Sequence, residues 1–284
     1  MTIGFIEALR DPARVRHLQP FGVEIDFDMA RPLDDDEAAA FRQMFFRETW
    51  LRFRNQRLTM DDQVRLIGHL GTVLPDFGSG YIHPEDEVLG SAALDYHSDM
   101  SASPLPMDAI SLLAIDLDEA AGSWTGFVSG KRAWARMPEA LREELARTEI
   151  TFVQTFADIS QLSYDIPDGD YRLTRPAVIT HRITGERLLF APESASARVE
   201  GLDRAASRAM LDRIFTHVRA PDNELRHVWR QGDLLIWDNI ALQHCRPALD
   251  PRYRRRLQRV GAAEKTLREQ YPQWDYGAFF GEDS

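Results

Sequence analysis

The chain has little cysteine and no long apolar run. Cys245 is its only cysteine, which excludes an internal disulfide framework and a cysteine zinc cluster. No apolar run approaches the roughly 18 to 20 residues of a membrane span. The opening residues MTIGFIEALR lack a basic stretch followed by an apolar one, so we expect no secretory signal. A single cysteine suits the reducing cytoplasm, where we expect the protein to work.

Positive charge is outnumbered, because 34 Lys and Arg stand against 45 Asp and Glu and the formal net charge is −11. A chain this acidic repels nucleic acid and anionic membranes, so we expect neither as a partner. The sequence has no GxGxxG motif and no P-loop, which removes the main support for a nucleotide-binding fold. Basic residues are dense only between Arg252 and Arg259. That cluster is compatible with an anion site and equally with a solvated strand edge.

The composition that remains is ordinary for a soluble globular protein, with 44% hydrophobic residues available for a core. No repeat, low-complexity tract or flexible linker divides the chain, so we expect one domain over 1–284. Helical patterns cover 37–48, 60–71 ending at Gly71, 129–148 and 203–220. Strand patterns cover 50–55, 107–117, 150–156, a hairpin over 176–192 that turns at Thr184-Gly185, 224–230, 233–239 and 253–262. Many short strands with few helices favour a β-sandwich or barrel with helices outside over a parallel βαβ fold.

A metal-binding pattern occurs in LDYHSDMS, where His97 and Asp99 are two positions apart. In an extended strand, residues i and i+2 point to the same face, so the imidazole and the carboxylate would converge. The pair alone is a weak signal, because a solvated or core histidine is the commoner case. His244, directly after the stretch DLLIWDNIALQ, is a candidate third ligand. Two histidines and one carboxylate suit Fe(II) that must also bind a co-substrate and dioxygen.

The segment YRRRLQRVGA supplies a possible anion site after His244. If it forms a strand, Arg255 and Arg259 share one face and would point inward together. Buried arginines are costly unless they are paired. A dicarboxylate ligand would pair them, with bidentate geometry available. The alternative is a pair of internal salt bridges with Asp or Glu.

Four stretches together carry a family resemblance: YHSD (96–99), GSWTGFVSG (122–130), GDLLIWDNIALQH (232–244) and RRRLQR (254–259). In order and separation they resemble the taurine dioxygenase and 2,4-dichlorophenoxyacetate dioxygenase family of Fe(II)/2-oxoglutarate-dependent oxygenases, over roughly residues 20–265. The resemblance implies a mainly β fold with flanking helices, the double-stranded β-helix or cupin-like jelly roll, with its core at about 90–262. It also implies oxidation of a small-molecule substrate, most simply hydroxylation of a C–H bond, with O2 consumed and succinate and CO2 released.

Transferred residue by residue, the resemblance assigns three iron ligands: His97, Asp99 and His244. Thr125 matches the threonine that hydrogen-bonds the distal carboxylate of 2-oxoglutarate, and Arg255 matches the arginine that pairs with the same carboxylate. Arg259 matches a second arginine, near the keto-acid end of the co-substrate and often near an anionic group of the substrate. A carboxylate held by one arginine and one hydroxyl is satisfied without solvent. We therefore expect a small organic acid or sulfonate as substrate.

The chain departs from the family pattern at several positions. Ser123-Trp124 replaces the usual Gly-Asp/Glu before Thr125, and Trp124 is compatible with a pocket cap or with surface packing. The asparagine and histidine that help to hold substrate in the taurine enzyme have no clear match, and His83 is a candidate substitute for the second. Cys245 reads as a small buried filler. These departures leave the substrate open.

Two rival functions remain at this point. A divalent-metal hydrolase on a jelly-roll scaffold would use the same ligands with zinc and a general base, but would leave two inward arginines unexplained. A non-enzymatic jelly-roll binding protein would need no convergent ligands. The sequence leaves open whether the chain forms a homo-oligomer.

Overall fold

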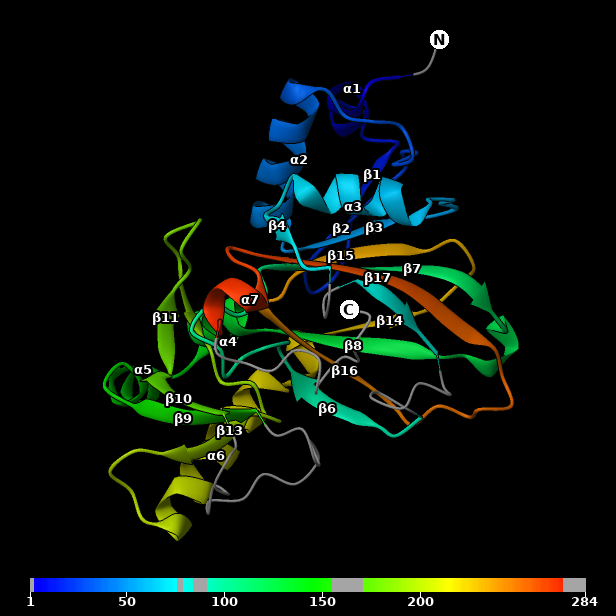
Figure 1. The fold of residues 1–284 in the computed structure, drawn as a ribbon. Helices are drawn as coiled ribbons and strands as arrows, with labels where there is room; N and C mark the ends of the chain where they lie inside the picture. The colour runs from blue at the N-terminus through cyan, green and yellow to red at the C-terminus, as the bar shows by residue number, and fades with distance from the viewer. Residues whose placement is uncertain (1–2, 76–78, 84–90, 155–170, 273–284) are drawn as a thin grey trace.

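The computed structural model describes residues 3–75, 79–83, 91–154 and 171–272. Within these residues two β-sheets face each other, and helices pack outside them (Figure 1). The helices α1 (Phe5–Arg10), α2 (Asp35–Glu48) and α3 (Met60–Gly68) lie together on the outer side of the larger sheet. No helix in the described part of the chain is long and apolar enough to cross a bilayer. The expected mainly β architecture with flanking helices is confirmed.

The larger sheet has eight strands in the order β1-β2-β3-β15-β7-β17-β4, with β5 paired to β17. Their bounds are β1 (Val15–His17), β2 (Val23–Ile25), β3 (Trp50–Phe53), β4 (Thr72–Val73), β5 (Gly80–Ile82), β7 (Ala109–Leu117), β15 (Leu234–Asp238) and β17 (Arg255–Ala263). The smaller sheet has the order β14-β8-β16-β6. Its strands are β14 (Glu224–Val228), β8 (Trp124–Ser129), β16 (Leu242–Arg246) and β6 (Leu94–His97).

Apart from the 3-10 turn at Glu119–Ala121, which joins β7 to β8, the remaining elements lie at one end of this sandwich (Figure 1). A three-stranded sheet has the order β10-β9-β13, and β11 pairs with β12. The strands are β9 (Glu149–Gln154), β10 (Tyr171–Pro176), β11 (Val178–Thr180), β12 (Arg187–Leu189) and β13 (Ser196–Val199). The helices are α4 (Gly130–Arg136), α5 (Glu139–Leu145), α6 (Arg204–Val218) and α7 (Leu267–Gln270), with short 3-10 turns at Glu119–Ala121 and Pro221–Asn223.

Strand β15 shows how the two cores are separated. Leu235 and Trp237 belong to the apolar cluster between the two sheets. Leu234 and Ile236, on the other face, belong to the cluster beneath α1, α2 and α3. Because successive side chains alternate across a strand, a strand covered on both faces reads as a continuous apolar run. This explains why the residues of β15 in the stretch DLLIWDN are apolar at four successive positions.

Most of the expected elements are confirmed, including α2, α6, β7, β15, β17 and the β11–β12 hairpin. The expected strand 150–156 is β9 up to Gln154, and its last two residues lie outside the described part.

Two helix predictions are wrong in their bounds. The single helix expected over 129–148 is divided into α4 and α5 at Pro138, because proline lacks an N–H and disfavours helical backbone in the residue before it. The helix expected to end at Gly71 ends at Gly68, followed by a tighter turn in which Leu70 N donates to Ile67 O at 2.8 Å. Gly71 instead allows close approach to β17, because a Cβ there would lie 3.0 Å from the carbonyl oxygen of Ala263.

Gly130 fixes the position of α4 beside the turn that leads into β16. Its N–H donates to the carbonyl of Ala241 at 2.9 Å. A Cβ at this position would collide with the carbonyl oxygen of Leu189. That oxygen belongs to the backbone and has no flexible side chain through which to move away. The close approach therefore requires glycine.

We predict that Gly130→Ala destabilises the fold by about 1–3 kcal/mol, the usual cost of overpacking. Gly68→Ala is the matched control, since it meets only a methyl group of Val73 at 4.0 Å and ends a helix. Alanine there should be neutral or stabilising by up to about 1 kcal/mol. Urea unfolding midpoints measure both variants, and equal midpoints would refute the close-packing argument.

Candidate metal and co-substrate site

The two histidines of the candidate site are brought together by strand pairing. β6 runs antiparallel to β16, and His97 is the direct partner of His244 in the register. Their ring centroids are 4.0 Å apart. The ring of His244 also contacts Trp237, at a centroid distance of 4.9 Å, and stacks on Phe127 at 6.3 Å. Aromatic packing therefore holds the His244 ring in one orientation.

Asp99 also lies beside His97, but a turn places it there and not the strand alternation that we expected. β6 ends at His97, so Asp99 does not lie in the strand and the strand-alternation argument is wrong. The chain turns instead: Ser101 N donates to Ser98 O at 3.2 Å, and Met100 has a φ of 59°. The turn brings Asp99 Oδ1 to 3.4 Å from His97 Nε2.

Asn239 clamps this turn onto the strand that precedes β16. Its Oδ1 accepts from Asp99 N at 3.0 Å, and its Nδ2 donates to Asp99 O at 3.1 Å. Nδ2 also donates to the carbonyl of Met107 at 3.0 Å. The side chain is fully buried. The position of Asp99 is therefore fixed by a hydrogen-bonded amide.

The three side chains form a donor set that fits a metal. One ligand atom each from His97, Asp99 and His244 lies within 4.8 Å of the others. His97 Nδ1 lies 2.7 Å from the carbonyl of Asp95, which can only accept, so the hydrogen is on Nδ1 and Nε2 keeps its lone pair. The Nδ1 atom of His244 is buried and has no hydrogen-bond partner among the described residues.

The charge state of the cluster also suits a divalent cation. Burial alone would raise the pKa of Asp99, but Arg259 and the two histidines outweigh burial and hold that pKa well below its usual range. Arg259 Nη2 donates to Asp99 Oδ2 at 2.5 Å, which leaves Oδ1 beside His97. Burial and the neighbouring His97 lower the pKa of His244, so its imidazole is neutral. A neutral imidazole and an ionised carboxylate are the forms that bind metals.

Arg255 lies in the interior as expected from the alternation of β17. It is buried, whereas Arg256 next to it is exposed. The Nε and Nη1 atoms of Arg255 have no hydrogen-bond partner among the described residues. Burial, together with the nearby Arg246, lowers the pKa of Arg255 to about 9. No carboxylate of the described residues forms a salt bridge with Arg255, so within this part of the chain an anionic ligand fits it better than the internal salt bridge.

Thr125 is buried on β8 with its hydroxyl oxygen already accepting a hydrogen bond. Trp229 Nε1 donates to Thr125 Oγ1 at 2.9 Å. The hydroxyl hydrogen of Thr125 is thereby left to donate to another acceptor. A carboxylate oxygen is an acceptor of the required kind.

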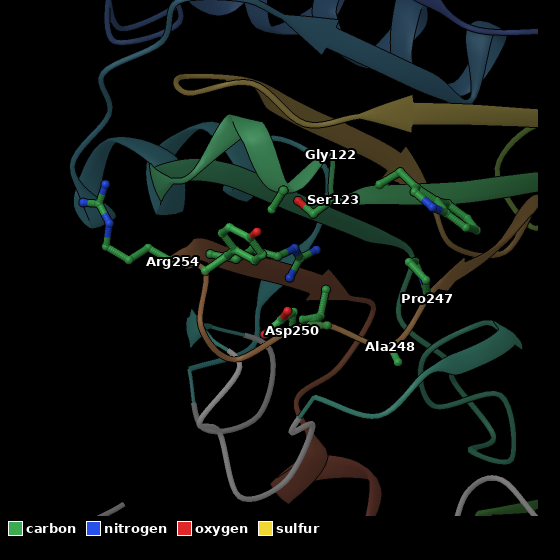
Figure 2. Close-up of a pocket in the computed structure, with 11 residues that line it drawn as sticks. Gly122, Ser123, Pro247, Ala248, Asp250 and Arg254 are labelled. Carbon is green, nitrogen blue, oxygen red and sulfur yellow. The ribbon is translucent and has the colours of Figure 1, made fainter.

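A pocket of about 300 Å³ lies beside Trp124, the first residue of β8 (Figure 2). Arg255 lines it together with Ser123 and Trp124, the two residues before Thr125. Figure 2 shows Gly122 and Ser123 on one side and Pro247, Ala248 and Asp250 on the opposite side. None of the three candidate metal ligands lines this pocket. It therefore lies at the arginine end of the site.

Residues 14–260 of the chain match the family model described as taurine catabolism dioxygenase TauD, TfdA family. The chain belongs to this family. It is 28% identical to the alpha-ketoglutarate-dependent 2,4-dichlorophenoxyacetate dioxygenase of Cupriavidus pinatubonensis, over 84% of this chain and 92% of that protein. It is also 28% identical to an alpha-ketoglutarate-dependent sulfate ester dioxygenase of Pseudomonas putida, over 75% and 76% of the two chains.

The fold of the TauD, TfdA family is confirmed by solved structures. A taurine dioxygenase from Burkholderia xenovorans superposes with a TM-score of 0.75 at 24% identity, covering 88% of this chain and 90% of that one. The expected jelly-roll fold and the expected enzyme class, a 2-oxoglutarate-dependent dioxygenase, are both confirmed at the level of the family.

Two residues of the site had no role in the sequence-based prediction. Asn239 is the only amide in the stretch DLLIWDNIAL, so a polar residue in an apolar run was the available signal. Trp229 gave no signal, because its contact with Thr125 joins residues 104 positions apart. Such contacts depend on the pairing of β14 with β8.

The structure places the three residues of uncertain role outside the metal cluster. Trp124 lines the pocket and carries the guanidinium of Arg226 at 4.0 Å from its ring centroid. Cys245 follows His244 on β16 and therefore points to the opposite face of the sheet, where it is buried beside Tyr96. Burial raises the pKa of its thiol. The filler interpretation of Cys245 agrees with this. His83 is half-buried and follows β5 directly.

We predict that Asn239→Ala weakens metal binding by about 10- to 100-fold, the usual effect of removing a group that orients a ligand. Asn223→Ala is the matched control: Asn223 is equally buried and its Nδ2 also donates to two carbonyls, those of Ser129 at 3.0 Å and Val218 at 2.8 Å. It should lose stability but keep metal affinity. Titration with Mn(II), followed by the EPR signal of the free ion, measures both, and equal affinities would show that the Asn239 clamp is dispensable.

Proposed function

We propose that the chain is an Fe(II)- and 2-oxoglutarate-dependent dioxygenase that hydroxylates an unactivated C–H bond of a small anionic organic molecule, with release of succinate and CO2. The proposal rests on two features that lie inside the same β-sandwich. Three convergent metal donors lie in the same sandwich as Arg255, a buried arginine whose Nε and Nη1 have no partner in the described chain. A metal and a dicarboxylate would satisfy both.

His97, Asp99 and His244 would hold the iron, whose role when bound is to activate dioxygen toward a substrate C–H bond. Arg259 fixes one carboxylate oxygen of Asp99 and leaves the other for the metal. The rings of Phe127 and Trp237 pack against His244 and cover that side of the cluster. Exclusion of water strengthens the electrostatic contacts and prevents side reactions.

Arg255 and Thr125 would hold the distal carboxylate of 2-oxoglutarate. A guanidinium offers a bidentate fork, and the Thr125 hydroxyl adds one neutral donor. The carboxylate would in turn supply the counter-charge that Arg255 lacks. A metal-dependent hydrolase would use the same three donors but would leave Arg255 without a function.

The wider assignments belong to the same proposal. We propose one catalytic domain over 1–284, with the jelly-roll core at about 90–262, acting in the cytoplasm on a free small molecule. The relatives named above act, by their names, on a phenoxyacetate and on sulfate esters, both anionic. Neither nucleic acid nor a membrane is proposed as a partner, in keeping with the net charge of −11.

The proposed function predicts a weak visible charge-transfer band when the apo-protein is titrated anaerobically with Fe(II) and 2-oxoglutarate. The band should require both and should be lost in His97→Ala, because the chelate needs the full ligand set. A missing band with Fe(II) demonstrably bound would remove 2-oxoglutarate from the proposal and favour the hydrolase.

The assignment of Arg255 predicts that Arg255→Met raises the dissociation constant of 2-oxoglutarate at least about 30-fold, since loss of one partner of a buried charge pair costs about 2–5 kcal/mol. Arg256→Met is the control, because Arg256 is exposed and its guanidinium lies over the ring of Tyr81 at 4.2 Å. Titration of the same band measures both affinities. An unchanged affinity in Arg255→Met would place the distal carboxylate elsewhere.

A further inference from the structure

A second arginine, the partly buried Arg175, has no carboxylate in contact with it among the described residues. It lies on β10, and its guanidinium packs over the rings of Phe190 and Phe152, at 5.3 and 5.8 Å from their centroids. Its Nη2 donates to the carbonyl of Ser103. Its Nε is buried without a hydrogen-bond partner among the described residues. Aromatic faces and one carbonyl do not neutralise a partly buried cation, which normally has a counter-charge.

Arg175 contacts the loop that follows Asp99, through the carbonyl of Ser103. Ser103 is four residues after Asp99, a separation that spans at most about 14 Å when extended. The loop is more compact than that, because Ser103 N donates to Met100 O at 2.9 Å. Gln270 of α7 also holds the loop, because its Oε1 accepts from Ser103 Oγ at 2.6 Å. Arg175 therefore borders the same loop that presents Asp99.

The segment after β12 brings Arg175 to the histidine strands as well. Phe190, under the guanidinium, begins a segment in which Ser194 N donates to the carbonyl of Tyr96 at 3.1 Å. Gln243 Nε2 donates to the carbonyl of Ala191 at 3.1 Å. Tyr96 and Gln243 each precede a candidate metal ligand. Arg175 thus lies between the two segments that flank the metal cluster.

Arg259, the other candidate partner for a substrate anion, is already engaged by Asp99 at 2.5 Å. We propose that Arg175 binds the anionic group of the substrate, a carboxylate, sulfonate or sulfate ester, while the apolar remainder of the substrate extends toward the metal. This inference rests on the proposed function, because it assigns a specificity residue to that site. Burial lowers the pKa of Arg175 to about 10, which agrees with a cation that lacks its counter-charge.

Calorimetry under argon tests the proposal on the enzyme loaded with Fe(II) and 2-oxoglutarate. The probes are 2,4-dichlorophenoxyacetate with its neutral primary amide, and hexyl sulfate with hexanol. We expect the wild-type chain to bind at least one anion ten-fold or more tightly than its neutral counterpart, and the better anion identifies the class. Arg175→Met should remove most of that preference, and Arg175→Lys should keep part of it. Arg172→Met, an exposed arginine on the same strand, is the control and should bind as the wild type does.

Each outcome counts for or against the role of Arg175. A wild-type chain that prefers neither anion, or an Arg175→Met variant that keeps the full preference, would overturn it. The charge-transfer band of the Fe(II)–2-oxoglutarate chelate, recorded on the same samples, separates this failure from failure of the proposed function. The band should be unchanged in Arg175→Met, which also shows that the variant is folded. A band absent from the wild type would instead refute the oxygenase site.

Discussion

The antiparallel pairing of β6 with β16 is the constraint on which the site depends, because it sets His97 directly opposite His244. The two residues are far apart in the chain, and only the register of these strands brings their rings to 4.0 Å. A slip by one residue would turn either side chain to the opposite face of the sheet. The turn at Asp99 and its clamp by Asn239 then complete a donor set around a geometry that the sheet has already fixed.

Charge inside the sandwich shows where ligands are needed. Elsewhere the fold neutralises a buried cation with its own carboxylates, as for Arg52, whose Nε donates to Glu24 at 2.7 Å. Arg255 and Arg175 differ from Arg52: no described carboxylate contacts either guanidinium, and Nε and Nη1 of Arg255 and Nε of Arg175 are buried without a described hydrogen-bond partner. An unpaired buried charge destabilises a fold by several kcal/mol in general, so it is found only where another favourable interaction offsets that free energy. Arg255 lines the pocket beside Trp124, and Arg175 contacts the loop that follows Asp99, which agrees with the ligand-binding roles proposed for both.

The parts of the fold that were predicted correctly are those that depend on the order of apolar and polar residues within one element. An apolar run flanked by turn residues identified β15, and alternation along β17 separated buried Arg255 from exposed Arg256. The predictions failed where a local rule met a stronger constraint. Pro138 interrupts a pattern that is otherwise helical, and Asp99 lies beyond the end of its strand although the two-residue spacing suggested otherwise.

The sequence by itself therefore determined the family, the chemical types of the candidate ligands and the face on which the arginines lie, because these depend on residue identity and on spacing along one element. Tertiary structure alone decided which groups meet. The contact of Trp229 with Thr125, the engagement of Arg259 by Asp99 and the place of Arg175 between two site loops all join distant segments. Residue spacing carries no information on such contacts, since they arise only when sheets and loops pack against one another.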